Sequence, residues 1–193
     1  MNPEDLVDQC RRCMEVGNFD RAIELLTEAI EIGPRNAEVF YLRGLCRLET
    51  ESPDKAVEDF NRALSVTADL QEAHFYRGFA FEKTGDFQQA AQAYTRALRA
   101  NPSNADAFIN RGMVYIHLEQ YDEAVADFSS ALELVPATAP AHYHRAVALT
   151  RQNRFLQAYR EAAKSVELDP FDPRFQILLN WLEERMDEDL QDS

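Results

Sequence analysis

Two of the three cysteines, Cys10 and Cys13, form a Cys-x-x-Cys pair, a spacing shared by thiol redox proteins and by half-sites for zinc. A zinc site would need a second such pair to complete four ligands, and the remaining cysteine, Cys46, stands alone in the sequence. We therefore expect three buried structural thiols, because a free cysteine packs as a small apolar residue. Redox or metal chemistry at Cys10 and Cys13 stays open as a remote alternative.

The histidines and the standard catalytic motifs offer no other chemistry. His142 and His144 lie two residues apart, so on one helix they point in different directions and do not share a metal. The sequence contains no His-Glu-x-x-His, no Gly-x-Ser-x-Gly and no Gly-Lys-Ser/Thr loop. We expect no catalytic residue, no metal ligand and no cofactor, and we expect that the chain is not an enzyme.

The charge of the chain limits its partners. It has 34 acidic and 20 basic residues, a formal net charge of −14 at pH 7. Binding to nucleic acid needs clustered cations, as does binding to an anionic membrane, so this balance argues against both. The sequence shows no apolar leader and no apolar run of about 18 residues. We therefore expect no membrane insertion, and the sparse cysteines favour a reducing, cytoplasmic location.

The sequence repeats with a period of 34 residues. The plainest series with this spacing is Ala22, Ala56, Ala90, Ala124 and Ala158. Further series of alanine, glycine and proline keep the same spacing. Five copies cover residues 3–172 without an insertion. A period of this length is typical of a solenoid built from stacked repeats.

Each repeat reads as two amphipathic helices, A and B. When each repeat is numbered 1–34 from residue 3, positions 4, 8 and 11 share one face of helix A, and positions 20, 24 and 27 share one face of helix B. Small residues at positions 8, 20 and 27 let the two backbones approach each other. Large residues at positions 4 and 24 fill the space between them.

The third repeat carries the fullest set of marker residues, which are Gly78, Phe81, Gly85, Phe87, Ala90, Tyr94, Ala97 and Pro102. In these positions the sequence resembles the tetratricopeptide repeat. The resemblance implies an all-α fold, a right-handed α-solenoid of five helix-turn-helix units with a C-terminal capping helix. We expect one solenoid over residues 1–186 and an acidic, disordered tail at 187–193. The repeats are 3–36, 37–70, 71–104, 105–138 and 139–172, and the capping helix is 173–186.

Position 7 of helix A is an arginine in four repeats: Arg43, Arg77, Arg111 and Arg145. Position 23 of helix B offers Asp59, Asp127 and Glu161, with Ala93 in the third repeat. A charged group beside a close-packed small residue needs a partner. We therefore expect Arg–carboxylate pairs that hold the repeats together.

The resemblance implies that positions 2, 5, 9 and 12 of the A helices line a concave groove. Positions 5, 9 and 12 are unusually apolar in this chain, and exposed apolar surface normally marks a binding site. Packing between neighbouring A helices is the alternative role. The expected groove residues are Tyr41, Leu45, Leu48, Phe75, Phe79, Ile109, Asn110, Met113, Ile116, Tyr143 and Val147, continued on the capping helix by Ile177 and Trp181.

Position 2 adds an acidic rim of Glu38, Glu72 and Asp106, which would complement basic residues of a ligand. Chaperone-binding relatives hold a C-terminal carboxylate with a clamp of Lys, Asn and Arg side chains. Asn110 matches its middle member, but Phe75, Phe79 and Pro140 stand where other members belong, so we expect no clamp.

These patterns predict a non-catalytic adaptor that binds a peptide or helix of another protein through apolar or aromatic anchors. The main alternative is a self-assembling scaffold, a homo-oligomer in which the groove accepts a neighbouring copy.

Overall fold

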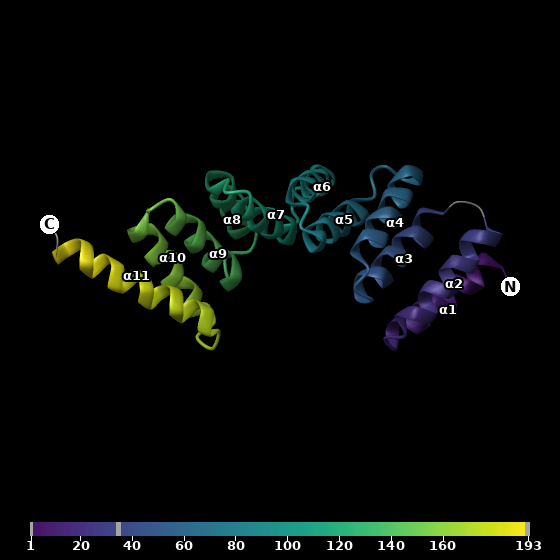
Figure 1. Ribbon diagram of the computed structural model, residues 1–193, viewed down its shortest axis with the longest axis horizontal. Helices are drawn as coiled ribbons and strands as arrows, with labels where there is room; N and C mark the ends of the chain where they lie inside the picture. Colours follow the sequence, from purple (N-terminus) through teal and green to yellow (C-terminus); the bar gives the residue numbers. More distant parts are fainter. Residues whose placement is uncertain (1, 34–35, 192–193) are drawn as a thin grey trace. The chain divides into compact units, whose positions relative to one another are not determined.

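The computed structural model describes residues 2–33 and 36–191, with side chains described as far as residue 188. Within those ranges the chain forms eleven α-helices and no β-strand (Figure 1), which confirms the predicted all-α fold. The helices are α1 (Pro3–Glu15), α2 (Phe19–Ile32), α3 (Ala37–Glu49), α4 (Pro53–Val66), α5 (Gln71–Thr84), α6 (Phe87–Ala100), α7 (Ala105–His117), α8 (Tyr121–Leu134), α9 (Ala139–Arg151), α10 (Phe155–Leu168) and α11 (Pro173–Gln191).

The helices α1 to α10 form five successive pairs, and each pair corresponds to one predicted repeat. Short turns join the two helices of a pair, and each turn contains one residue with a positive φ angle. This residue is Gly17, Glu51, Gly85, Glu119 or Asn153, with φ between 52° and 79°. The five turns therefore share one left-handed conformation, although only two of them have the glycine that favours it.

The chain divides into two compact units, Met1–Pro102 and Ser103–Ser193. The first contains α1 to α6 and the second contains α7 to α11. One continuous solenoid over residues 1–186 stays a prediction.

Within a repeat, helix A and helix B touch where a glycine meets an aromatic ring. A Cβ atom added to Gly78 on α5 would lie 2.8 Å from Cε1 of Tyr94 on α6, so only a glycine fits there without a shift of the ring. Gly44 and Gly112 lie equally close to Phe60 and Phe128. The expected packing of position 8 against position 24 is thus present in repeats 2, 3 and 4.

The capping helix α11 covers the last repeat with an apolar stripe. Phe175 and Leu182 are buried, and Leu178 and Leu179 pack against the cluster formed with α9 and α10. The helix continues to Gln191, so the predicted end at residue 186 and the predicted start of a disordered tail at 187 are too early. No glycine or proline follows Pro173 to stop the helix. Residues 192 and 193 lie outside the described part.

Candidate protein-binding surface

The expected groove residues of the first compact unit are all partly buried. Tyr41, Leu45 and Leu48 lie on α3, and they pack against a buried cluster built from α3, α4 and α5. These side chains therefore support the core and still reach the surface, so the two roles considered from the sequence do not exclude each other.

The surroundings of Tyr41 show how apolar this surface is. Its ring centroid lies 6.2 Å from that of Phe60 and 6.0 Å from that of Tyr76. Burial, and then the nearby Tyr76 and Glu72, raise the pKa of Tyr41 to about 12. The hydroxyl group therefore stays neutral at physiological pH, and Tyr41 acts as an aromatic packing residue.

On α5, Phe75 and Phe79 have different neighbours. The Phe75 ring centroid lies 5.6 Å from that of Tyr94. The Phe79 ring has Nζ of Lys83 at 5.0 Å from its centroid, in a cation–π arrangement. A ligand that stacks on this face of Phe79 would have to share it with Lys83.

In the second compact unit, Ile109, Met113 and Ile116 lie on α7 and pack against the buried cluster around Phe128. Asn110, on the same helix, is partly buried. On α9, the Tyr143 ring centroid lies 5.0 Å from that of Phe175 on the capping helix. These side chains of α7 and α9 therefore also pack against the core and still reach the surface.

The Trp181 pocket lies at the C-terminal end of the predicted groove. It has a volume of about 540 Å³ and is formed by α9, the start of α10 and α11. Trp181 is 45% exposed, and its ring centroid lies 6.2 Å from that of Phe155. Ile177, one turn earlier on α11, is 67% exposed. The residues that line the pocket are Val147, Thr150, Arg151, Asn153, Phe155, Leu178, Trp181 and Arg185.

Val147, Thr150 and Trp181 occupy predicted groove positions, whereas the sequence did not indicate Phe155 or Leu178. Phe155 is the first residue of α10 and Leu178 lies beside the apolar stripe of α11, so neither occupies a groove position. The signal that could have found Phe155 is its place directly after the A–B turn, at the same end of the repeat as Val147 and Thr150.

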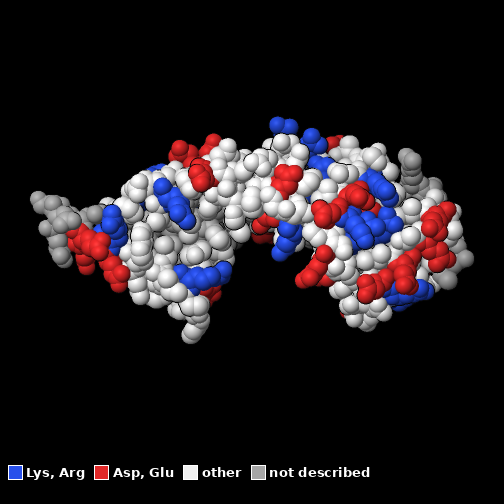
Figure 2. Space-filling model, in the orientation of Figure 1, with Lys and Arg blue, Asp and Glu red and all other residues white. Residues whose placement is uncertain are grey.

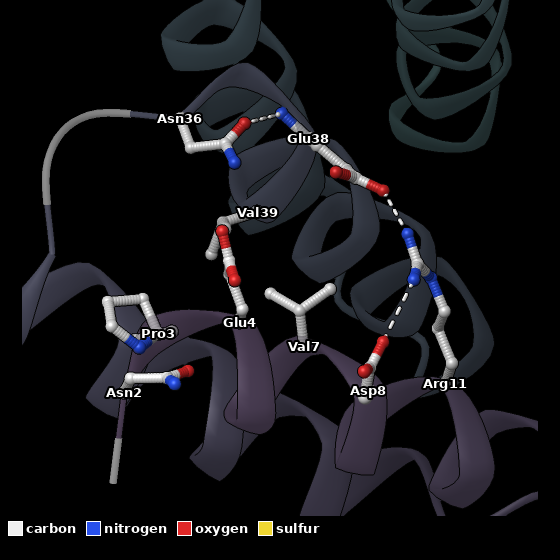
Figure 3. Close-up of a pocket in the computed structure, with 10 residues that line it drawn as sticks. Asn2, Pro3, Glu4, Val7, Asp8, Arg11, Asn36, Glu38 and Val39 are labelled. Atoms are coloured by element: carbon white, nitrogen blue, oxygen red, sulfur yellow. Dashed lines mark hydrogen bonds and ion pairs between the residues drawn. The ribbon is translucent and has the colours of Figure 1, made fainter.

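The acidic rim is exposed as expected, since Glu38, Glu72 and Asp106 all reach solvent. Figure 2 shows Asp and Glu side chains spread over α1 and α2. Arg11, however, donates hydrogen bonds to both Glu38 and Asp8 at the edge of a pocket of about 660 Å³ (Figure 3). The rim is therefore partly neutralised at Glu38, which the sequence did not indicate.

The predicted arginine ladder is present in three of its four repeats. Arg43 donates from Nε and Nη2 to Asp59 at 2.9 and 2.7 Å, and Arg111 donates in the same way to Asp127 at 2.7 Å. Arg145 lies 2.6 Å from Glu161. Asp59 and Asp127 are buried, so their pairs lie inside the repeats, whereas Arg145 and Glu161 are partly exposed.

The cysteines are free thiols, and the close pair is not the one that the spacing suggested. Cys10 on α1 and Cys46 on α3 are buried in the same cluster, while Cys13 is partly buried. A hydrogen bond between the Cys10 and Cys46 thiols lowers the pKa of Cys10 and raises that of Cys46.

Among the described residues no group of three or more His, Cys, Asp or Glu side chains is placed to hold a metal ion. The described helices also include none that is long and apolar enough to cross a membrane.

Solved structures resemble this fold over most of the chain. A structure of MamA from Desulfovibrio magneticus RS-1 is 20% identical, with a TM-score of 0.83 over 89% of this chain and 97% of that one. A tetratricopeptide repeat protein from Parabacteroides merdae is 21% identical, with a TM-score of 0.84 over 98% of this chain and 75% of that one. YrrB, described as a TPR protein with an unusual peptide-binding site, is 20% identical, with a TM-score of 0.81 over 89% of this chain and 88% of that one.

No curated protein matches the sequence significantly. The tetratricopeptide repeat family, in contrast, matches residues 11–74, 77–139 and 116–173, which together span most of the chain. The marker residues, the five helix pairs and the glycine–aromatic contacts agree with that match. The chain belongs to the tetratricopeptide repeat family.

Proposed function

We propose that this chain is a non-catalytic adaptor that binds a peptide or helical segment of another protein. The observation that carries the proposal is the Trp181 pocket, where a large aromatic side chain is 45% exposed in a concavity lined by apolar residues and two arginines. Tryptophan is a frequent anchor at the centres of protein interfaces, because it buries a large area with few rotatable bonds.

The neighbours of Trp181 support a role in binding. Ile177 is more exposed than Trp181 and lies on the same face of α11, one turn away. On the same helix Phe175 and Leu182 are buried and Leu178 and Leu179 are partly buried, so Ile177 and Trp181 are the large apolar residues most open to water, which is costly. A partner that covers Ile177 and Trp181 would recover this burial.

The charges around the pocket indicate what the partner carries. Arg151 and Arg185 line the pocket, and the Arg185 guanidinium also lies over the Phe155 ring, with Cζ 5.8 Å from its centroid. An apolar anchor that enters here would be favoured by an acidic neighbour in the partner sequence. Near the acidic rim of the first unit, Glu38 and Glu72 would instead favour a basic residue in the partner sequence.

Binding assays on matched variants test this proposal. A partner captured from a native lysate is reduced to its shortest binding segment, and its affinity is measured for the wild type, Trp181→Ala and Leu156→Ala. Leu156 is also exposed but does not line the pocket, so it is the matched control. We expect Trp181→Ala to weaken binding by roughly 1–3 kcal/mol and Leu156→Ala to leave it unchanged. Equal affinities for the wild type and Trp181→Ala would refute the proposal.

Light scattering over a range of protein concentrations separates the adaptor from the self-assembling scaffold. A mass that grows with concentration in the wild type, and not in Trp181→Ala, would assign the pocket to a neighbouring copy. A constant monomer mass supports the adaptor.

A further inference from the structure

The third repeat breaks the pattern of buried arginine–carboxylate pairs. In repeats 2 and 4 the carboxylate stands 16 residues after the arginine. The corresponding residue after Arg77 is Ala93, which is buried and whose methyl group accepts no hydrogen bond. No described carboxylate forms an ion pair with Arg77, so its guanidinium charge is not neutralised within this part of the chain.

The contacts that Arg77 does make are with neutral acceptors. Its Nη1 donates to Oδ1 of Asn61 at 2.8 Å, and its Nη2 lies 3.3 Å from Nδ1 of His74. Nε2 of His74 lies 3.0 Å from the carbonyl oxygen of Ala68, which can only accept, so Nε2 carries the proton and Nδ1 accepts from Arg77. Burial lowers the pKa of His74, in agreement with this neutral tautomer.

One donor of Arg77 remains unused. Its Nε is buried and has no hydrogen-bond partner, and it is the only such side-chain nitrogen or oxygen among the described residues. In Arg43 and Arg111 the same atom donates to the aspartate of the pair. The unused donor therefore marks the place where the other repeats hold a carboxylate, and leaving it unpaired is costly.

A pocket of about 300 Å³ opens at this place in the first compact unit. Asn61, Arg77, Ala93 and Arg96 are among the residues that line it. This volume is at the small end of the range of ligand pockets, roughly 300–1,000 Å³, and suits a side chain or a small anion.

The charge around the pocket is positive in a chain that is strongly negative overall. Helix α6 contains Arg96 and Arg99 but no acidic residue, and Figure 2 shows Lys and Arg side chains over it. Asp86 is the acidic residue of the pocket, and its Oδ1 accepts a hydrogen bond from the backbone N–H of Gln89 at the start of α6. Its charge thus serves as the helix cap, and Arg77 and Arg96 together exceed it.

We infer that this pocket is a binding subsite for a carboxylate, supplied by an Asp or Glu side chain of a partner polypeptide. The incoming carboxylate enters this pocket beside Ala93, at the position equivalent to Asp59 and Asp127, and accepts hydrogen bonds from the guanidinium of Arg77. A carboxylate is favoured over a larger anion because the equivalent arginines of repeats 2 and 4 donate two hydrogen bonds each to a carboxylate at this place.

This subsite is separate from the predicted groove. On α5, Arg77 and Phe79 are two residues apart, which places them roughly 200° apart around the helix. The inference does not rest on the proposed function, and either can fail without the other.

Nuclear magnetic resonance of the arginine Nε–Hε groups tests the subsite in the full chain. The resonance of Arg77, assigned by its loss in Arg77→Lys, is followed during titration with N-acetyl-glutamate amide, whose only carboxylate is on the side chain. The neutral glutamine analogue, at the same ionic strength, is the matched control. We expect a saturable shift of the Arg77 resonance with the carboxylate and none with the amide.

The variant Ala93→Asp provides the decisive comparison, because it restores the carboxylate that repeats 2 and 4 possess. We expect its Arg77 resonance to start at a shifted position and its affinity for the glutamate analogue to fall by about tenfold or more. An unchanged affinity in Ala93→Asp, equal shifts with the neutral analogue or no shift in the wild type would overturn the inference. Inorganic phosphate is a third titrant, and tighter binding of phosphate than of the carboxylate would contradict the assigned ligand class.

Discussion

Arginine–carboxylate pairs join helix A to helix B at equivalent positions of repeats 2, 4 and 5, and the pairs of repeats 2 and 4 are the more deeply buried. Arg43 and Asp59 are both nearly inaccessible to solvent, and Asp127 is almost as deeply buried as Arg43. Loss of either partner from such a pair is strongly destabilising, because the remaining buried charge then has neither water nor a counter-ion.

The pair in the fourth repeat gives a direct test of this dependence. We expect Arg111→Ala to lower the free energy of unfolding by about 3–5 kcal/mol, since Asp127 is left buried without its partner. The double variant Arg111→Ala/Asp127→Ala should lose less than the sum of the two single changes. Chemical denaturation measures all three, and additive losses would show that the pair is not coupled.

His144 supplies a pH-dependent contribution to stability. Its ring stacks on Phe128 at 5.9 Å, and burial, followed by the charge of Arg174, lowers its pKa from 6.5 to about 4. His144 therefore binds a proton less readily in the folded state than in the unfolded state. The stability that neutral His144 contributes to the folded state is fully present above pH 6.5 and is lost as the pH falls towards 4.

Comparison with His144→Phe isolates this effect from the other acid-sensitive groups. Between pH 7.5 and pH 4, we expect the wild type to lose up to about 3 kcal/mol more stability than the variant. Denaturation curves at several pH values measure the difference. A difference that stays constant with pH would mean that His144 titrates normally in the folded chain.

At the scale of the helices, the turns between helix A and helix B in repeats 2, 4 and 5 hold a residue other than glycine at a positive φ angle. Glu119 has a φ of 59°, in the left-handed region where a Cβ is unfavourable. It is exposed, so its side chain is not held there by packing. The conformation is imposed by the two helices that the turn connects.

Replacing Glu119 with glycine should therefore raise the free energy of unfolding by about 1 kcal/mol. Glu123→Gly, four residues later inside α8, is the matched control and should lower it by about 1 kcal/mol. Thermal and chemical denaturation measure both variants. A loss of stability in Glu119→Gly would show that the glutamate side chain contributes to the turn.

The helices were predictable because their marker residues recur in a fixed register, and the arginine pairs because a charge next to Gly44 or Gly112 needs a partner. The acidic run after residue 186 favours a disordered tail by its composition, but nothing in it stops a helix, and α11 extends to Gln191. The Cys10–Cys46 contact and the Trp181 pocket join residues from different helices, and their spacing in the sequence does not carry that information.

At the scale of the molecule, the capping helix should matter only to its own neighbours. Removal of residues 173–193 uncovers the buried faces of α9 and α10, which Phe175 and Leu182 help to cover. We expect amide hydrogen exchange to speed up in α9 and α10 while α1 to α6 keep their protection. Equal loss of protection in every helix would contradict a fold built from nearest-neighbour contacts.

The fluorescence of Trp181 reports directly on whether a partner protein covers this residue, because the chain has one tryptophan. Emission spectra are recorded in dilute protein, before and after addition of a binding segment that itself lacks tryptophan. We expect the emission of a partly exposed indole in the free chain and a shift to shorter wavelength on binding, both absent in Trp181→Phe. An emission maximum that stays unchanged when the segment binds would show that the partner does not cover Trp181.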